Sequence, residues 1–143
     1  MKCITYKKGY KYQLVDTYKT TIDIKPEENR VTKYIELTIE GDLTIKAGYA
    51  WDGPSGPTFD TPNFMRGSLV HDALYQLMRL EELDFTKDRD PADRLLQKMC
   101  KEDGMGSARA WWVYQGLRLA GKAAANPENA KERFPAPKGC KED

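Results

Sequence analysis

The sequence predicts an α+β fold, in which an N-terminal antiparallel β-meander is packed by about three C-terminal helices. Three observations favour it: short β-rich segments fill residues 1–47, a Gly/Pro-rich loop follows over residues 48–62, and apolar residues then recur at helical spacing. A chain of 143 residues suits one domain. We place that domain at residues 1–125 and a polar, proline-containing tail at residues 126–143.

The first strands are short. Residues 4–6 and 10–15 are rich in β-branched and aromatic side chains, and Lys7-Lys8-Gly9 supplies a turn between them. Residues 20–24 place two isoleucines on one face of a further strand. We expect these segments to form an antiparallel sheet with one face in water.

The clearest strand pattern covers residues 35–45. Apolar residues alternate with polar ones up to Ile39, and a second alternating pair begins at Leu43. A two-residue turn would oppose Ile39 to Thr44 and mix the faces, whereas a three-residue loop opposes Ile39 to Leu43 and keeps the apolar faces together. We therefore predict a three-residue loop at residues 40–42.

The loop at residues 48–62 contains three glycines and three prolines, a density that no regular element tolerates. Loops of this length inside a compact domain often serve a function. Proline reduces the number of backbone conformations, so we expect a stiff wall rather than a flexible linker.

The first helix is predicted to start at Pro62, because Thr61 is a good N-cap and proline suits the first helical position. A stripe of apolar residues then continues to Leu80. His71 and Tyr75 are four residues apart and share a face of this helix.

The second helix is predicted to start at Pro91. Asp90 would be its N-cap, and Asp93 would lie in the first turn, where the helix dipole favours a carboxylate. The charged residues 81–89 would then connect the two helices. A third helix is predicted over residues 107–124.

The third helix carries a tryptophan pair. We assign Trp111 and Trp112 to the core and its rim rather than to a ligand cage. Small residues, beginning with Gly116, form a side of this helix that another element could approach closely.

Charge and composition exclude several classes of function. The chain has 23 basic and 22 acidic side chains, so it lacks the basic excess that neutralises nucleic-acid phosphates. The cysteines at positions 3, 100 and 140 match neither a zinc motif nor a disulfide framework. Neither a signal peptide nor a long apolar run is present, which predicts a cytoplasmic protein without a membrane anchor.

The adjacent pair His71-Asp72 is the first candidate site. An imidazole titrates near neutral pH and can act as a base, an acid or a metal ligand, and the carboxylate could bind the same metal. Metal-dependent phosphohydrolases with a His-Asp pair need further histidines, and His71 is the only one here. The alternative is a packed helix histidine that is hydrogen-bonded to the loop.

The loop supplies further candidates next to Trp51. Asp52 and Ser55 follow it in a Gly/Pro turn, where short polar side chains often bond their own backbone. Alternatively the turn aims Asp52 at the helix face of His71, where a carboxylate would support the charged imidazole. Ser55 is not in a Gly-x-Ser-x-Gly elbow, which argues against a serine nucleophile.

Four motifs occur in a fixed order: Gly48-Tyr-Ala-Trp-Asp-Gly-Pro-Ser55, His71-Asp-Ala-Leu-Tyr75, Pro91-Ala-Asp93 and Leu117-Arg-Leu-Ala-Gly121. Over about residues 35–121 this series resembles the small phage and prophage proteins grouped as domain of unknown function family 1353. The resemblance implies a phage origin but no established activity. The positions that it marks as a site are Asp52, Ser55, His71, Asp72, Tyr75 and Asp93. Trp51 stands where the family has a smaller residue, often threonine.

Two functions are then expected. In the first, the chain is a small phage-encoded hydrolase assisted by a divalent metal. His71 is its general base or a metal ligand, and Asp72 and Asp93 are metal ligands or orient the histidine. Asp52 is a loop carboxylate and Tyr75 is a hydrogen-bond donor. In the second, the chain is a non-enzymatic phage protein that binds other virion proteins or a host protein, and the cluster is a structural network. Either form would act in the host cytoplasm or the virion.

Overall fold

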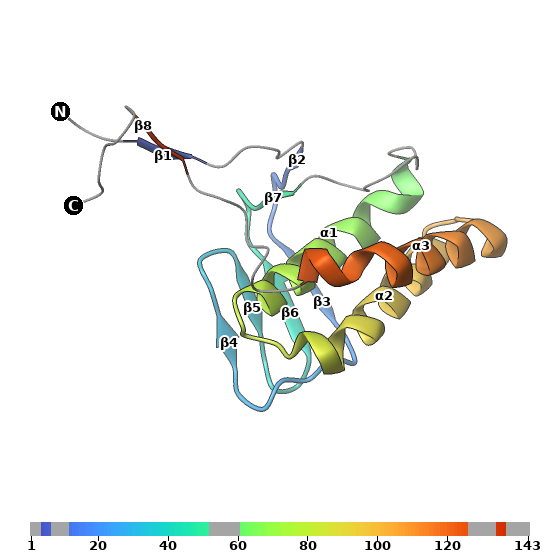
Figure 1. Ribbon diagram of the computed structural model, residues 1–143, viewed down its shortest axis with the longest axis horizontal. Coiled ribbons are helices and arrows are strands. Elements are labelled where there is room, and N and C mark those ends of the chain that lie inside the picture. Colours follow the sequence, from blue (N-terminus) through green and yellow to red (C-terminus); the bar gives the residue numbers. More distant parts are fainter. Residues whose placement is uncertain (1–3, 7–11, 52–60, 126–133, 137–143) are drawn as a thin grey trace.

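The computed structural model describes residues 4–6, 12–51, 61–125 and 134–136. Antiparallel strands occupy its N-terminal part and three helices follow, which confirms the predicted α+β fold (Figure 1). The strands are β1 (Ile4–Tyr6), β2 (Tyr12–Gln13), β3 (Tyr18–Thr21), β4 (Arg30–Val31), β5 (Ile35–Leu37), β6 (Asp42–Ile45), β7 (Ala50–Trp51) and β8 (Phe134–Ala136). The helices are α1 (Pro62–Arg79), α2 (Phe85–Glu102) and α3 (Ser107–Ala125).

The main sheet has four antiparallel strands in the order β3-β6-β5-β4. Strands β4, β5 and β6 follow one another as in a meander, and β3 adds to the free side of β6. The apolar side chains of β5 and β6 are fully buried against α1, with Ile35 opposite Ile45 and Leu37 opposite Leu43. Burial of this face fixes the register, since a slip of one residue would turn the apolar side chains to water.

The hairpin between β5 and β6 turns over residues 38–41, so the predicted loop at residues 40–42 and the predicted register are both wrong. Leu37, rather than Ile39, lies opposite Leu43. Gly41 has a φ of 91° and donates its N–H to the carbonyl of Thr38 at 3.0 Å, a conformation that glycine adopts without a Cβ clash. Ile39 therefore lies in the turn and is 52% exposed.

The two N-terminal strands pair with distant segments. β1 pairs with β8, and β2 pairs with β7, both antiparallel. The expectation that they belong to the same sheet as the later strands is therefore wrong. The turn predicted at residues 7–9 and most of the tail at residues 126–143 lie outside the described residues.

Helix α1 starts as predicted, with Thr61 at the N-cap and Pro62 in the first position. Most of its apolar residues pack on the inner face of the sheet, whereas Phe64 packs against Leu96 and Cys100 of α2. Leu80, which follows the last turn, is half exposed. Gly67 allows α2 to come close, because a Cβ there would lie 2.6 Å from Cδ1 of Leu96.

The predicted start of the second helix is wrong. Helix α2 begins at Phe85, because the side chain of Asp84 accepts hydrogen bonds from the N–H groups of Thr86 and Lys87 at 2.9 and 3.4 Å. Pro91 lies inside the helix. Asp90 is therefore not an N-cap, and Asp93 is not in the first turn.

Helix α3 covers the predicted range, but its tryptophans are not in the core. Trp111 is 52% and Trp112 is 72% exposed, and their rings meet edge to face. Val113 and Ala110 provide the buried side of the helix instead. Within the described parts of the chain, none of the helices combines the length and the apolar character that crossing a bilayer needs.

Candidate functional site

His71 lies in the middle of α1 and faces α2. Its Nε2 donates to Oδ1 of Asp93 at 2.7 Å. Tyr75, one turn further along α1, donates its hydroxyl to the same oxygen at 2.5 Å. The two rings are stacked obliquely with centroids 4.0 Å apart. Asp93 therefore meets both residues of the α1 face that the sequence singles out.

The second oxygen of Asp93 is bound from α3. Nη1 of Arg118 lies 3.3 Å from Oδ2 of Asp93 and 3.6 Å from Oδ1 of Asp90. We call His71, Tyr75, Asp93 and Arg118 the His71–Asp93 network. It joins all three helices through one carboxylate.

The network has a more exposed end at Asp90. Tyr114 donates its hydroxyl to Oδ1 of Asp90 at 2.5 Å, and Nε of Arg94 donates to Oδ2 at 2.8 Å. These two hydrogen bonds hold the pKa of the Asp90 carboxyl below its usual range. Asp90 therefore stays charged and helps to hold Arg118 beside Asp93.

Burial and the nearby carboxylates determine the pKa values of His71 and Tyr75 in the network. His71 is 5% exposed and Asp93 is fully buried. Burial alone lowers the pKa of His71, but the carboxylates of Asp72 and Asp93 raise it by more, so the net pKa lies above the ordinary value. Burial and the Asp93 carboxylate also raise the pKa of Tyr75. These shifts favour the protonated imidazole of His71 and the neutral phenol of Tyr75.

Asp72 is close to His71 without a hydrogen bond to it. Its Oδ1 lies 4.0 Å from Nδ1 of His71, so the contact is one of charge, and the Asp72 side chain is about one-third exposed. In the regions that the structure describes, no group of three or more His, Cys, Asp or Glu side chains is arranged to hold a metal ion. The proposed metal set of His71, Asp72 and Asp93 is not assembled there as a three-ligand site.

The loop wall is described only at its start. Trp51 is buried, and its indole N–H donates to the hydroxyl of Ser68 at 3.2 Å. Ser68 lies one turn before His71, so Trp51 ties the loop entrance to the helix that carries the network. Asp52 and Ser55 lie outside the described residues.

Arg118 is not among the site residues that the sequence predicts. A signal for it exists, since a carboxylate at the centre of a helical domain needs a cation or several donors. For an Asp93 in the first turn of a helix, as predicted, the helix dipole would stabilise the carboxylate, and no cationic partner would be needed.

Comparisons with known proteins identify no relative. No protein-family model matches the chain, and searches of curated proteins and of solved structures found no significant match.

Proposed function

We propose that the chain is a non-enzymatic, phage-type protein that binds a partner protein, and that the His71–Asp93 network is structural. The observation that carries this proposal is closure of the network. Both oxygens of Asp93 accept hydrogen bonds from the chain itself, and the imidazole of His71 is almost completely buried. A general base must come within hydrogen-bond reach of a substrate proton. Here His71, the candidate base, is already hydrogen-bonded to Asp93 inside the protein.

The exposed face of α3 supports binding of a protein partner. Trp112, Gly116 and Leu119 follow one another at spacings of four and three, so they form one stripe on the helix. Trp112 and Leu119 are 72% and 88% exposed. None of the described residues has an atom within 4 Å of the position that a Cβ on Gly116 would take, so a partner backbone can approach there.

This pattern fits a helix of the partner packed along α3. Large apolar side chains on either side of a small residue form a groove into which side chains of a second helix fit. Tryptophan is also enriched among the residues that dominate binding energy at protein interfaces. The resemblance to phage proteins supports a virion protein or a host protein as that partner.

The proposal is tested by cross-linking followed by measured affinity. A photoreactive amino acid at position 112 in host cells identifies candidate partners, which are then purified and titrated with the chain. We expect Trp111→Ser with Trp112→Ser to weaken binding at least about tenfold, which corresponds to about 1.4 kcal/mol. Val31→Ser, which changes an exposed apolar residue on β4, is the matched control and should leave the affinity unchanged.

Two results would argue against the proposal. One is a purified partner whose affinity is unchanged by the tryptophan substitutions. The other is a rise in melting temperature on addition of Mg²⁺ or Mn²⁺ that is lost in His71→Ala, because a ligand stabilises the fold that binds it. That second result would favour the metal-assisted hydrolase.

A further inference from the structure

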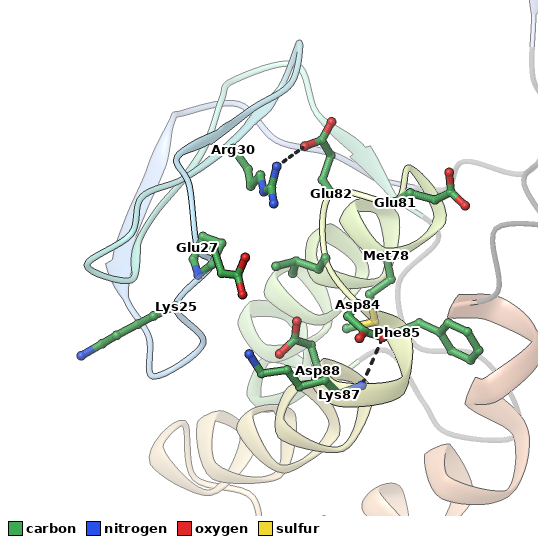
Figure 2. Close-up of a pocket in the computed structure, with 12 residues that line it drawn as sticks. Lys25, Glu27, Arg30, Met78, Glu81, Glu82, Asp84, Phe85, Lys87 and Asp88 are labelled. Atoms are coloured by element: carbon green, nitrogen blue, oxygen red, sulfur yellow. Dashed lines mark hydrogen bonds and ion pairs between the residues drawn. The ribbon is translucent and has the colours of Figure 1, made fainter.

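A pocket of about 500 Å³ lies at the opposite end of α1 from the loop, separate from the His71–Asp93 network. One wall is the segment between β3 and β4, and the other is the connection from α1 to the first turn of α2 (Figure 2). The volume falls in the range of small-molecule sites. Its charged lining residues are Lys25, Glu27, Arg30, Glu81, Glu82, Asp84, Lys87 and Asp88.

Carboxylates outnumber cations in this lining by five to three. Glu27 and Asp88 come from opposite walls, and Figure 2 shows both carboxylates turned toward the interior. Glu27 is exposed, and among the described residues neither carboxylate has a side-chain hydrogen bond or an ion pair. Burial raises the pKa of Asp88, although Lys87 and the backbone N–H of Asp84 act in the opposite direction. A cationic group between the two walls would be attracted by both carboxylates.

Arg30 offers the complementary charge. Its Nη1 lies 3.7 Å from Glu82 and 4.0 Å from Glu28, distances too long for hydrogen bonds. Its Nε is buried and has no acceptor among the described residues. The guanidinium is therefore incompletely paired, and a ligand carboxylate beside its exposed part would add a favourable charge.

The floor of the pocket is apolar. Met78 and Leu83 are buried members of the main core and also line the pocket. Between them, Glu81 has a φ of 60°, a conformation that usually requires glycine at the end of a helix. Figure 2 shows its side chain pointing away from the pocket. Glu81 therefore shapes the wall of the pocket through its backbone conformation and not through its side chain.

We propose that this pocket binds a small zwitterion, namely a free α-amino acid with an apolar side chain. Its ammonium group would lie between Glu27 and Asp88, and its carboxylate would pair with the guanidinium of Arg30. Its side chain would lie over the apolar floor at Leu83. This inference is independent of the partner surface on α3, because the two sites share no residues.

The ligand test uses three compounds of matched shape in calorimetric titrations. L-leucine carries both charges, 3-methylbutylamine only the ammonium group, and 4-methylpentanoate only the carboxylate. We expect saturable binding of L-leucine at millimolar or lower concentration, and each analogue to bind at least about tenfold more weakly. Absence of saturable L-leucine binding up to about 10 mM would overturn the proposal, and so would equal binding of the amine.

Variants locate the site within the intact chain. We expect Arg30→Gln and Asp88→Asn each to weaken L-leucine binding at least about tenfold. Lys25→Gln is the control, because Lys25 lines the pocket but points away from its interior in Figure 2. Binding that is unchanged in Arg30→Gln and Asp88→Asn, or equally weakened in Lys25→Gln, would place the ligand elsewhere and refute the assignment.

Discussion

The His71–Asp93 network and the pocket beside Arg30 contain the same kinds of side chain, carboxylates and cationic groups, but they differ in how many partners each group has. Both oxygens of Asp93 accept hydrogen bonds from the chain. In the pocket, the carboxylates of Glu27 and Asp88 have no side-chain donor among the described residues, and Nε of Arg30 lacks an acceptor there. A closed cluster stabilises the fold, whereas an open cluster leaves interaction energy for a ligand.

The largest effect should come from opening the closed cluster. Asp93→Asn keeps the volume but removes the charge that His71 and Arg118 share. Breaking a buried ion pair by removing one partner costs about 3–5 kcal/mol, so we expect a loss of this size in urea unfolding. Asp72→Asn is the control, since Asp72 has no hydrogen bond to His71, and it should cost less than about 1 kcal/mol. Equal losses of unfolding free energy in Asp93→Asn and Asp72→Asn would contradict the view that the hydrogen bonds of Asp93 stabilise the fold.

The second effect concerns pH. The folded pKa of His71 lies above its unfolded value of about 6.5, so the stability that it contributes is full below about pH 6.5 and is lost as pH rises through the folded pKa. Because one proton is involved, the slope cannot exceed about 1.4 kcal/mol per pH unit. Urea unfolding between pH 6 and 8 measures it, and His71→Gln should remove it. As the only histidine, His71 can also be titrated directly by NMR.

A stability that does not change from pH 6 to 8 in the wild type would contradict the raised pKa. The pKa of Asp90 is shifted downward, away from this window. Burial raises the pKa of the Cys100 thiol to about 11, above the window.

The smallest effect should come from the open cluster. Burial raises the pKa of Asp88, so its ionised form is disfavoured in the folded chain at neutral pH. Asp88→Asn removes this penalty and also a favourable charge in the first turn of α2, and the two changes oppose each other. We expect the melting temperature to stay the same or to rise slightly. A loss of stability in Asp88→Asn comparable to the loss in Asp93→Asn would show that Asp88 stabilises the fold.

Local signals in the sequence predicted some elements well. The start of α1 followed from Pro62, because the fixed φ of proline acts locally, although the side chain of Thr61 at the N-cap makes no capping hydrogen bond. The same rule misplaced the start of α2. Asp90 and Pro91 have the signature of a helix start, but Asp84 supplies the actual cap two turns earlier. A proline within a helix loses one hydrogen bond, and the packing of α2 on α1 and α3 compensates for that loss.

The site could be predicted only in part, because it depends on how the helices cross. His71 and Tyr75 share a face through local geometry, and the sequence was sufficient for that. Their contact with Asp93 depends on Gly67, one turn before His71. The absence of a side chain at Gly67 lets α2 approach near Leu96, one turn after Asp93. The short side chain of Asp93 can then reach the imidazole. No local pattern encodes this distance.

The pairing of β1 with β8 also determines how the chain would respond to mechanical force. Ile4 lies opposite Ala136 and Tyr6 opposite Phe134, so the segments before β1 and after β8 leave the ribbon at the same end. A pull on these segments would load the hydrogen bonds one rung at a time, as in unzipping. The two strands would separate before any load reached the helices. An optical-trap experiment would therefore record a first low-force extension while α1, α2 and α3 stay folded.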